Sequence, residues 1–154
     1  GEICAIDPQA HRRELAQRLG AAHVGASVTE LRDWTGGEGA PLVVEATNSP
    51  FGFRDAVLAA RIGGRIVLVG IPDGDTYTLP AADARRRGLK IKFSRRMGEV
   101  YPRAIALVES GTVDVATLVT RTFALEDAPE AFRLHAADAD GMVKSLIYPN
   151  GQDR

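Results

Sequence analysis

Asp7 and Arg12 are the residues near the N-terminus whose types and spacing suit ligand binding. Asp7 directly follows the apolar run ICAI (residues 3–6), and Arg12 begins the helical segment behind it. A carboxylate at the end of a strand can accept hydrogen bonds from both hydroxyls of an adenosine ribose, and it repels a 2'-phosphate. Arg12 can reach a ribose hydroxyl or a phosphate. The alternatives are that Asp7 only caps a helix or lies in a loop, and that Arg12 shares a solvated basic face with Arg13.

Two later segments end in small residues that would let a flat ligand approach the backbone. They read EAT (residues 45–47) and VGIP (69–72). Backbone N–H and C=O groups next to a glycine can bind a carboxamide. The alternative is a simple turn from strand to loop. The candidate binding residues in these segments are Ala46, Thr47, Val69, Gly70 and Ile71.

The remaining chemically active side chains form no recognisable centre. Three histidines, at positions 11, 23 and 135, have no metal-ligand spacing among themselves or with Cys4. Cys4 is the single cysteine and lies within an apolar run, so we expect a small buried hydrophobe. The run of arginines at 85–87 ends a short helix and is interpreted as a solvated face. We therefore predict neither a catalytic residue nor a metal ligand in this sequence.

These candidate residues must be positioned by strands and helices that alternate along the chain. Continuous apolar runs are typical of buried parallel strands, and right-handed crossovers would join such strands into one sheet. The pattern predicts an α/β fold with a doubly wound parallel sheet of the Rossmann type, which binds ligands at the carboxyl ends of its strands. The predicted strands are residues 3–6, 23–26, 42–46, 65–70 and 89–93.

Local signals mark several helix ends. Ser27 and Glu30 have the spacing of a capping box. Ser49 followed by Pro50 predicts the start of another helix, and the glycine pair at 63–64 predicts its end.

The pattern changes after Gly111. Residues 117–125 are predicted to form a strand, residues 126–137 an amphipathic helix, and residues 142–148 a closing strand. This β-α-β tail is expected to belong to a different sheet. The inward face of its helix is predicted to hold Ala131, Phe132 and Leu134.

Composition excludes some classes of partner. The chain has 154 residues, 45% of them apolar and 25% charged, with a formal net charge of -1. These values are ordinary for a globular domain and do not suggest electrostatic binding to nucleic acid or to a membrane. We expect a cytoplasmic protein because no signal peptide or membrane span is evident. The chain does not begin with methionine, and we expect a piece of a longer polypeptide.

Five segments together resemble, in order and spacing, the C-terminal half of zinc-type medium-chain dehydrogenases. The nearest branches are the polyol (sorbitol-like) and threonine dehydrogenases. The segments are VVEATNSP (43–50), GGRIVLVGIP (63–72), YPRAIALVESG (101–111), LVTRTFALEDAPEAF (118–132) and VKSLIY (143–148).

This resemblance implies an oxidoreductase that transfers hydride between an alcohol or polyol and NAD, with NADP less favoured. It implies that Asp7 selects NAD and that Arg12 lies beside the adenosine ribose. The residues at 46–47 would line the adenosine side, and those at 69–71 would face the nicotinamide carboxamide. Arg95 and Arg96 fall where polyol dehydrogenases have a Phe-Arg pair near the nicotinamide, and Arg95 departs from that pattern.

The resemblance also implies what this sequence lacks. The zinc ligands, the proton relay and the first Rossmann strand with its GxGxxG loop would all lie upstream. We therefore expect residues 1–116 to be a partial dinucleotide-binding domain and residues 117–154 to be the tail of a GroES-like catalytic domain. The missing strand belongs between the strand ending at Asp7 and the one ending at Ala46. We expect weak stability of the isolated chain, no turnover by it alone, and a dimer or tetramer for the whole enzyme.

Two other functions remain open. The chain can be a non-catalytic nucleotide-binding or dimerisation module, in which LKIKFS (89–94) pairs between subunits. It can also be a methyltransferase-like domain, because such domains hold a ribose with an acidic residue at the second strand.

Overall fold

The structure, a computed structural model, describes residues 1–74, 76–95, 98–137 and 141–150. It divides into two compact units, Gly1–Met97 and Gly98–Arg154. The predicted domain boundary after residue 116 stays a prediction.

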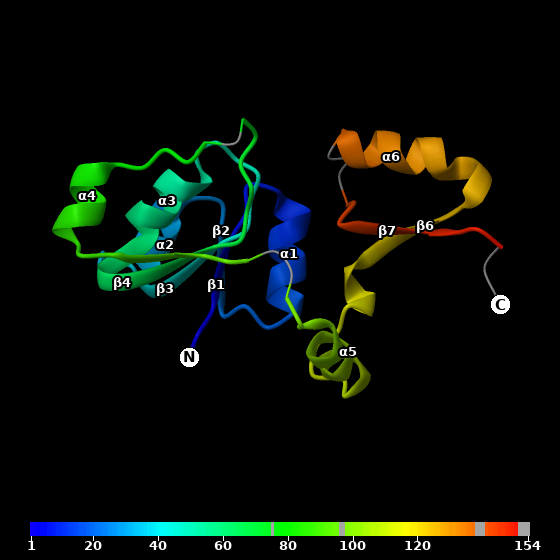
Figure 1. Ribbon diagram of the computed structural model, residues 1–154, viewed down its shortest axis with the longest axis horizontal. Helices are drawn as coiled ribbons and strands as arrows, with labels where there is room; N and C mark the ends of the chain where they lie inside the picture. The colour runs from blue at the N-terminus through cyan, green and yellow to red at the C-terminus, as the bar shows by residue number, and fades with distance from the viewer. Residues whose placement is uncertain (75, 96–97, 138–140, 151–154) are drawn as a thin grey trace. The chain divides into compact units, whose positions relative to one another are not determined.

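The first unit alternates short strands and helices, as the apolar runs predict (Figure 1). Most strands begin or end within two or three residues of the predicted limits, and β4 starts earlier than predicted. The elements are β1 (Cys4–Ile6), α1 (Ala10–Arg18), β2 (His23–Gly25), α2 (Val28–Trp34), β3 (Ala40–Glu45), α3 (Gly52–Ala59), β4 (Ala60–Leu68), α4 (Ala81–Arg86) and β5 (Lys90–Phe93).

All strand pairs of this unit are parallel, which confirms the α/β class with parallel sheets. The prediction of one continuous sheet is wrong for the described residues. β1 pairs only with β2, and β3, β4 and β5 form a separate sheet in that order. β1 and β3 are the two strands expected to flank a missing central strand. In the described residues β1 and β3 do not pair with each other.

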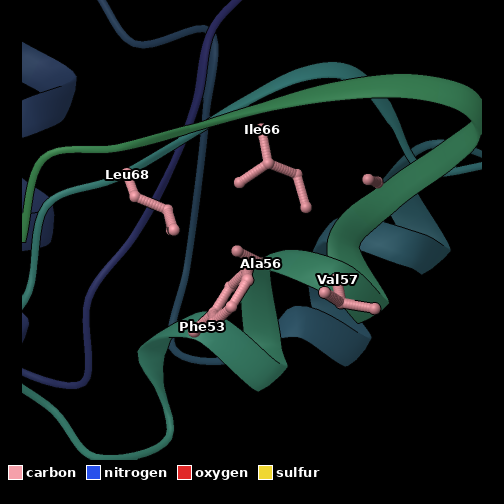
Figure 2. Close-up of a cluster of buried hydrophobic side chains, with 6 residues drawn as sticks. Phe53, Ala56, Val57, Ile66 and Leu68 are labelled. Carbon is pink, nitrogen blue, oxygen red and sulfur yellow. The ribbon is translucent and has the colours of Figure 1, made fainter. Parts of the chain in front are cut away.

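The core of the first unit lies between α3 and one face of the β3-β4-β5 sheet. Figure 2 shows Phe53, Ala56 and Val57 of α3 turned toward Ile66 and Leu68 of β4. The helical residues are spaced by three and four positions, so they share one face of α3. All five side chains are buried. This packing fixes the carboxyl end of β4, from which the segment 69–72 leaves the sheet.

The capping box at α2 is confirmed, and the predicted limits of α3 are wrong. The Oγ of Ser27 accepts a hydrogen bond from the N–H of Glu30 at 3.5 Å. Ser49 instead accepts from the N–H of Phe51 at 3.1 Å, a local turn that delays the start of α3 to Gly52. α3 ends at Ala59, and the glycine pair at 63–64 lies within β4.

The second unit contains a parallel pair of strands with a helix between them. β6 and β7 form their own two-stranded sheet, as predicted for the tail. Ala131 is buried in α6, but Phe132 is 71% exposed, so the prediction that Phe132 points inward is wrong for this unit. The elements are α5 (Tyr101–Glu109), a 3₁₀ helix (Ala116–Leu118), β6 (Val119–Ala124), a 3₁₀ helix (Leu125–Asp127), α6 (Ala128–Ala136) and β7 (Lys144–Tyr148).

No helix in the described part of the chain is both long and apolar enough to span a membrane.

Candidate functional site

A cavity of about 710 Å³ lies in the first unit, at the carboxyl ends of β1, β3, β4 and β5. Ligands of open α/β sheets bind at this edge because the strands are parallel and end together. Eight of the nine predicted binding residues line the cavity. The ninth, Arg96, lies outside the described residues. The eight are Asp7, Arg12, Ala46, Thr47, Val69, Gly70, Ile71 and Arg95.

Asp7 lies in the turn before α1 and also lines the cavity. Its Oδ1 accepts a hydrogen bond from the N–H of Gln9 at 2.8 Å, which organises the turn into α1. Its Oδ2 lies 4.0 Å from Nη1 of Arg12, and the Asp7 side chain is 31% exposed. One carboxylate oxygen therefore has a structural role, and the other lies beside an arginine at the cavity.

Arg13 is not part of a simple solvated face. Its Nη1 donates to the carbonyl oxygens of Asp7 at 2.7 Å and of Pro8 at 2.8 Å. These bonds direct the guanidinium of Arg13 to the backbone of the turn. The two neighbouring arginines therefore differ: Arg12 lines the cavity and Arg13 braces the loop.

Gly70 lies where the backbones of two adjacent strand ends meet. The carbonyl oxygen of Glu45 accepts from the N–H of Val69 at 2.8 Å and from that of Gly70 at 3.1 Å. A Cβ on Gly70 would lie 2.6 Å from the backbone nitrogen of Thr47. A side chain at Gly70 is thus excluded by space. The close approach leaves the segments around Thr47 and Gly70 as one continuous wall of the cavity.

Tyr77 is a lining residue that the sequence did not reveal. Its hydroxyl donates to the carbonyl oxygen of Gly70 at 2.7 Å. Its ring makes edge contacts with Phe53 and Phe93, at centroid distances of 5.5 and 5.4 Å. Tyr77 comes from an irregular segment after β4, where no periodic pattern predicts side-chain direction. The other lining residues that sequence reasoning missed are Asn48, Leu68, Phe93 and Ser94.

The described residues contain no group of three or more His, Cys, Asp or Glu side chains able to hold a metal ion. Cys4 is half-buried. Burial, and to a smaller degree the negative charge of Glu30, raises the pKa of its thiol. A raised pKa keeps the thiol protonated at neutral pH, which makes it a poor nucleophile and a poor metal ligand.

Comparison with known proteins gives a consistent family. The family model described as zinc-binding dehydrogenase matches residues 1–110. A sorbitol dehydrogenase of Bacillus subtilis is 26% identical over 97% of this chain and 44% of its own length. An alcohol dehydrogenase of Cupriavidus necator is 33% identical over 96% of this chain and 43% of its own.

The fold has relatives among solved structures. The crystal structure of 2R,3R-butanediol dehydrogenase from Bacillus subtilis superposes with a TM-score of 0.80 at 25% identity, over 97% of this chain and 44% of that one. The chain thus spans less than half the length of the relatives it matches.

Proposed function

Because the chain belongs to the zinc-binding dehydrogenase family, we propose that its cavity binds a nicotinamide dinucleotide that exchanges hydride with an alcohol or polyol. The relatives' names, sorbitol, alcohol and butanediol dehydrogenase, support that substrate class. The observation that carries the proposal is the convergence of eight residues, chosen from sequence, on one cavity at the strand ends. In such enzymes the cofactor supplies the hydride chemistry, and the protein binds and orients it.

Different cavity residues contact different parts of the cofactor. Asp7 and Arg12 hold the adenosine ribose, because a carboxylate oxygen and a guanidinium lie together there. Ala46 and Thr47 line the adenosine side. The backbone at 69–71 faces the nicotinamide carboxamide, where Gly70 allows close approach. Arg95 and Arg96 are proposed to lie near the nicotinamide.

NAD is the proposed cofactor in preference to NADP. The negative charge of Asp7 repels a 2'-phosphate and can accept bonds from free ribose hydroxyls. The positive charge of Arg12 or Arg13 would instead favour the 2'-phosphate, and Nη1 of Arg12 lies 4.0 Å from Oδ2 of Asp7. The guanidinium of Arg13, however, is hydrogen-bonded to the backbone at Asp7 and Pro8.

Zinc has no set of ligands among the described residues. In this family a catalytic zinc polarises the substrate oxygen and eases loss of its proton. We propose that its ligands belong to a catalytic domain outside this sequence, since the relatives are more than twice as long. The role of this chain is then to bind and orient the dinucleotide, and by itself it should not oxidise alcohols.

Calorimetric titration of the purified chain with NAD and with NADP tests the proposal. We expect NAD to bind more tightly. Asp7→Asn should reduce the preference for NAD about tenfold, because a charged acceptor is replaced by a neutral amide. Asp33→Asn, on the exposed side of α2, changes the same charge away from the cavity and should leave the preference intact. Equal affinity for both cofactors in the wild-type chain would contradict the choice of NAD.

A non-catalytic dimerisation module is the second candidate, because β5 forms one edge of the β3-β4-β5 sheet. The exposed Lys90 and Lys92 on β5 weigh against it, since lysines on an edge strand discourage pairing. Light scattering during size-exclusion chromatography measures the mass of the chain. A defined dimer that binds NAD without turnover would favour this candidate over part of a dehydrogenase. Tighter binding of S-adenosylmethionine than of NAD would instead indicate a methyltransferase-like domain.

For the whole enzyme we propose a homo-oligomer, dimer or tetramer, in the cytoplasm.

A further inference from the structure

We propose that the buried carboxylate of Glu45 is a positioning residue, which sets the backbone geometry of the cavity wall at Thr47 and Gly70. Through that wall it controls the affinity for the dinucleotide, so the inference rests on the proposed function. Glu45 does not itself line the cavity. It acts on the ligand through residues that do.

Glu45 is the one polar or charged residue that is buried in the described part of the chain, with 7% of its surface exposed. It is the last residue of β3. Its Oε1 accepts two hydrogen bonds from Thr47, one from the backbone N–H at 2.7 Å and one from Oγ1–H at 2.6 Å. A buried carboxylate is costly unless it is hydrogen-bonded, and these two donors satisfy one of its oxygens.

Two glycines leave room for this carboxylate. A Cβ on Gly52 would lie 2.5 Å from Oε1 of Glu45 and 2.5 Å from Oγ1 of Thr47. A Cβ on Gly70 would lie 2.7 Å from Oε2 of Glu45. The carboxylate is therefore enclosed between the start of α3 and the end of β4. The positive end of the α3 dipole further favours the negative charge of the Glu45 carboxylate, which lies beside Gly52.

The same contacts assign a direction to the Thr47 hydroxyl. Its proton is donated to Glu45, and its oxygen accepts from the N–H of Ser49 at 3.2 Å. The hydroxyl is thus used within the protein. We infer that Thr47 meets the dinucleotide through its backbone and its methyl group, and that its O–H does not donate to the ligand.

Glu45→Gln and Thr47→Val test this arrangement. Glutamine keeps the size of Glu45 but removes the charge, and valine keeps the shape of Thr47 but removes its donor. Each should raise the Kd for NAD about tenfold at a temperature where circular dichroism shows a folded chain. Thr47→Ser restores the hydroxyl and should bind NAD more tightly than Thr47→Val. Glu38→Gln, at an exposed loop position, is the matched charge control.

A readout without ligand separates this inference from the proposed function. In ¹⁵N NMR spectra, the amide of Thr47 should shift upfield in Glu45→Gln, because it loses a charged acceptor. If the wild type does not bind NAD, the proposed function fails, and the shift still reports the Glu45 contact. A folded Glu45→Gln chain with an unchanged Thr47 amide and a wild-type Kd would overturn the inference. If Glu45→Gln does not fold, a wild-type Kd in Thr47→Val overturns it instead.

Discussion

Gly70 is held from two directions, and this explains how a short turn can form a defined wall. On one side its N–H donates to the Glu45 carbonyl, and the Thr47 backbone lies so close that a Cβ on Gly70 would not fit. On the other side the Tyr77 hydroxyl donates to its carbonyl oxygen. The N–H groups of Val69 and Gly70 and the carbonyl of Gly70 are bonded within the protein. A backbone fixed in this way need not reorganise when a ligand binds, which lowers the entropic cost of binding.

Tyr77→Phe should loosen that wall. The variant removes the hydroxyl that donates to the Gly70 carbonyl, while the ring contacts with Phe53 and Phe93 can persist. We expect a loss of about 1 kcal/mol in the free energy of unfolding, measured by urea denaturation, and weaker binding of NAD. Tyr148→Phe, on β7 in the second unit, is the control. Unchanged stability and NAD affinity in Tyr77→Phe would show that this hydrogen bond contributes to neither.

The carboxyl end of α3 is capped by the side chain of Arg87, which is distant in sequence. Nη1 of Arg87 donates to the carbonyl oxygens of Leu58 at 3.1 Å and Ala60 at 2.9 Å. These bonds satisfy carbonyls that a helix end leaves without partners. Arg32 adds a bond to the Leu58 carbonyl at 3.1 Å. The prediction that the whole run 85–87 is a solvated face is therefore wrong at Arg87.

Arg87→Ala and Arg86→Ala make a matched pair of neighbouring variants. Arg87→Ala should lower the free energy of unfolding by about 2 kcal/mol, because charge-assisted, part-buried hydrogen bonds to backbone carbonyls are lost. Arg86 is exposed at the end of α4, so its removal should cost less than about 0.5 kcal/mol. Denaturation followed by circular dichroism compares the two. Equal losses would contradict a specific role of Arg87 at the end of α3.

The division of the strands into separate sheets governs the stability of the molecule. Within the described residues, the edges of β1 and β3 that face each other in the expected strand order form no ladder. Leu42 and Val44 of β3 are 47% and 59% exposed. Unpaired strand edges and exposed apolar side chains lower stability and favour association.

We therefore predict a weakly stable isolated chain. Thermal unfolding followed by circular dichroism should be broad and should occur at low temperature. Hydrogen exchange should be faster in β1 and β3 than in β4, which is paired on both sides and contributes Ile66 and Leu68 to the core. A sharp, cooperative transition at high temperature would contradict this prediction.

The local order of the fold could be predicted from sequence because it depends on short-range signals. Continuous apolar runs predict β1 to β5, and the spacing of Ser27 and Glu30 predicts the start of α2. The convergence of the cavity residues follows as well, since the carboxyl ends of parallel strands meet at one edge. Asp7 can be predicted in this way, whereas Arg95 follows only from the resemblance to polyol dehydrogenases.

The sequence by itself thus determined the class of fold, the strands and the edge at which the candidate binding residues meet. Only the tertiary structure decided how the cavity wall and the carboxyl end of α3 are held. The Glu45 carboxylate, the Tyr77 hydroxyl and the Arg87 guanidinium act on backbone atoms whose positions depend on the packing of several segments. The separation of β1 from β3 is also a tertiary result, because strand pairing requires a neighbour that local sequence does not specify.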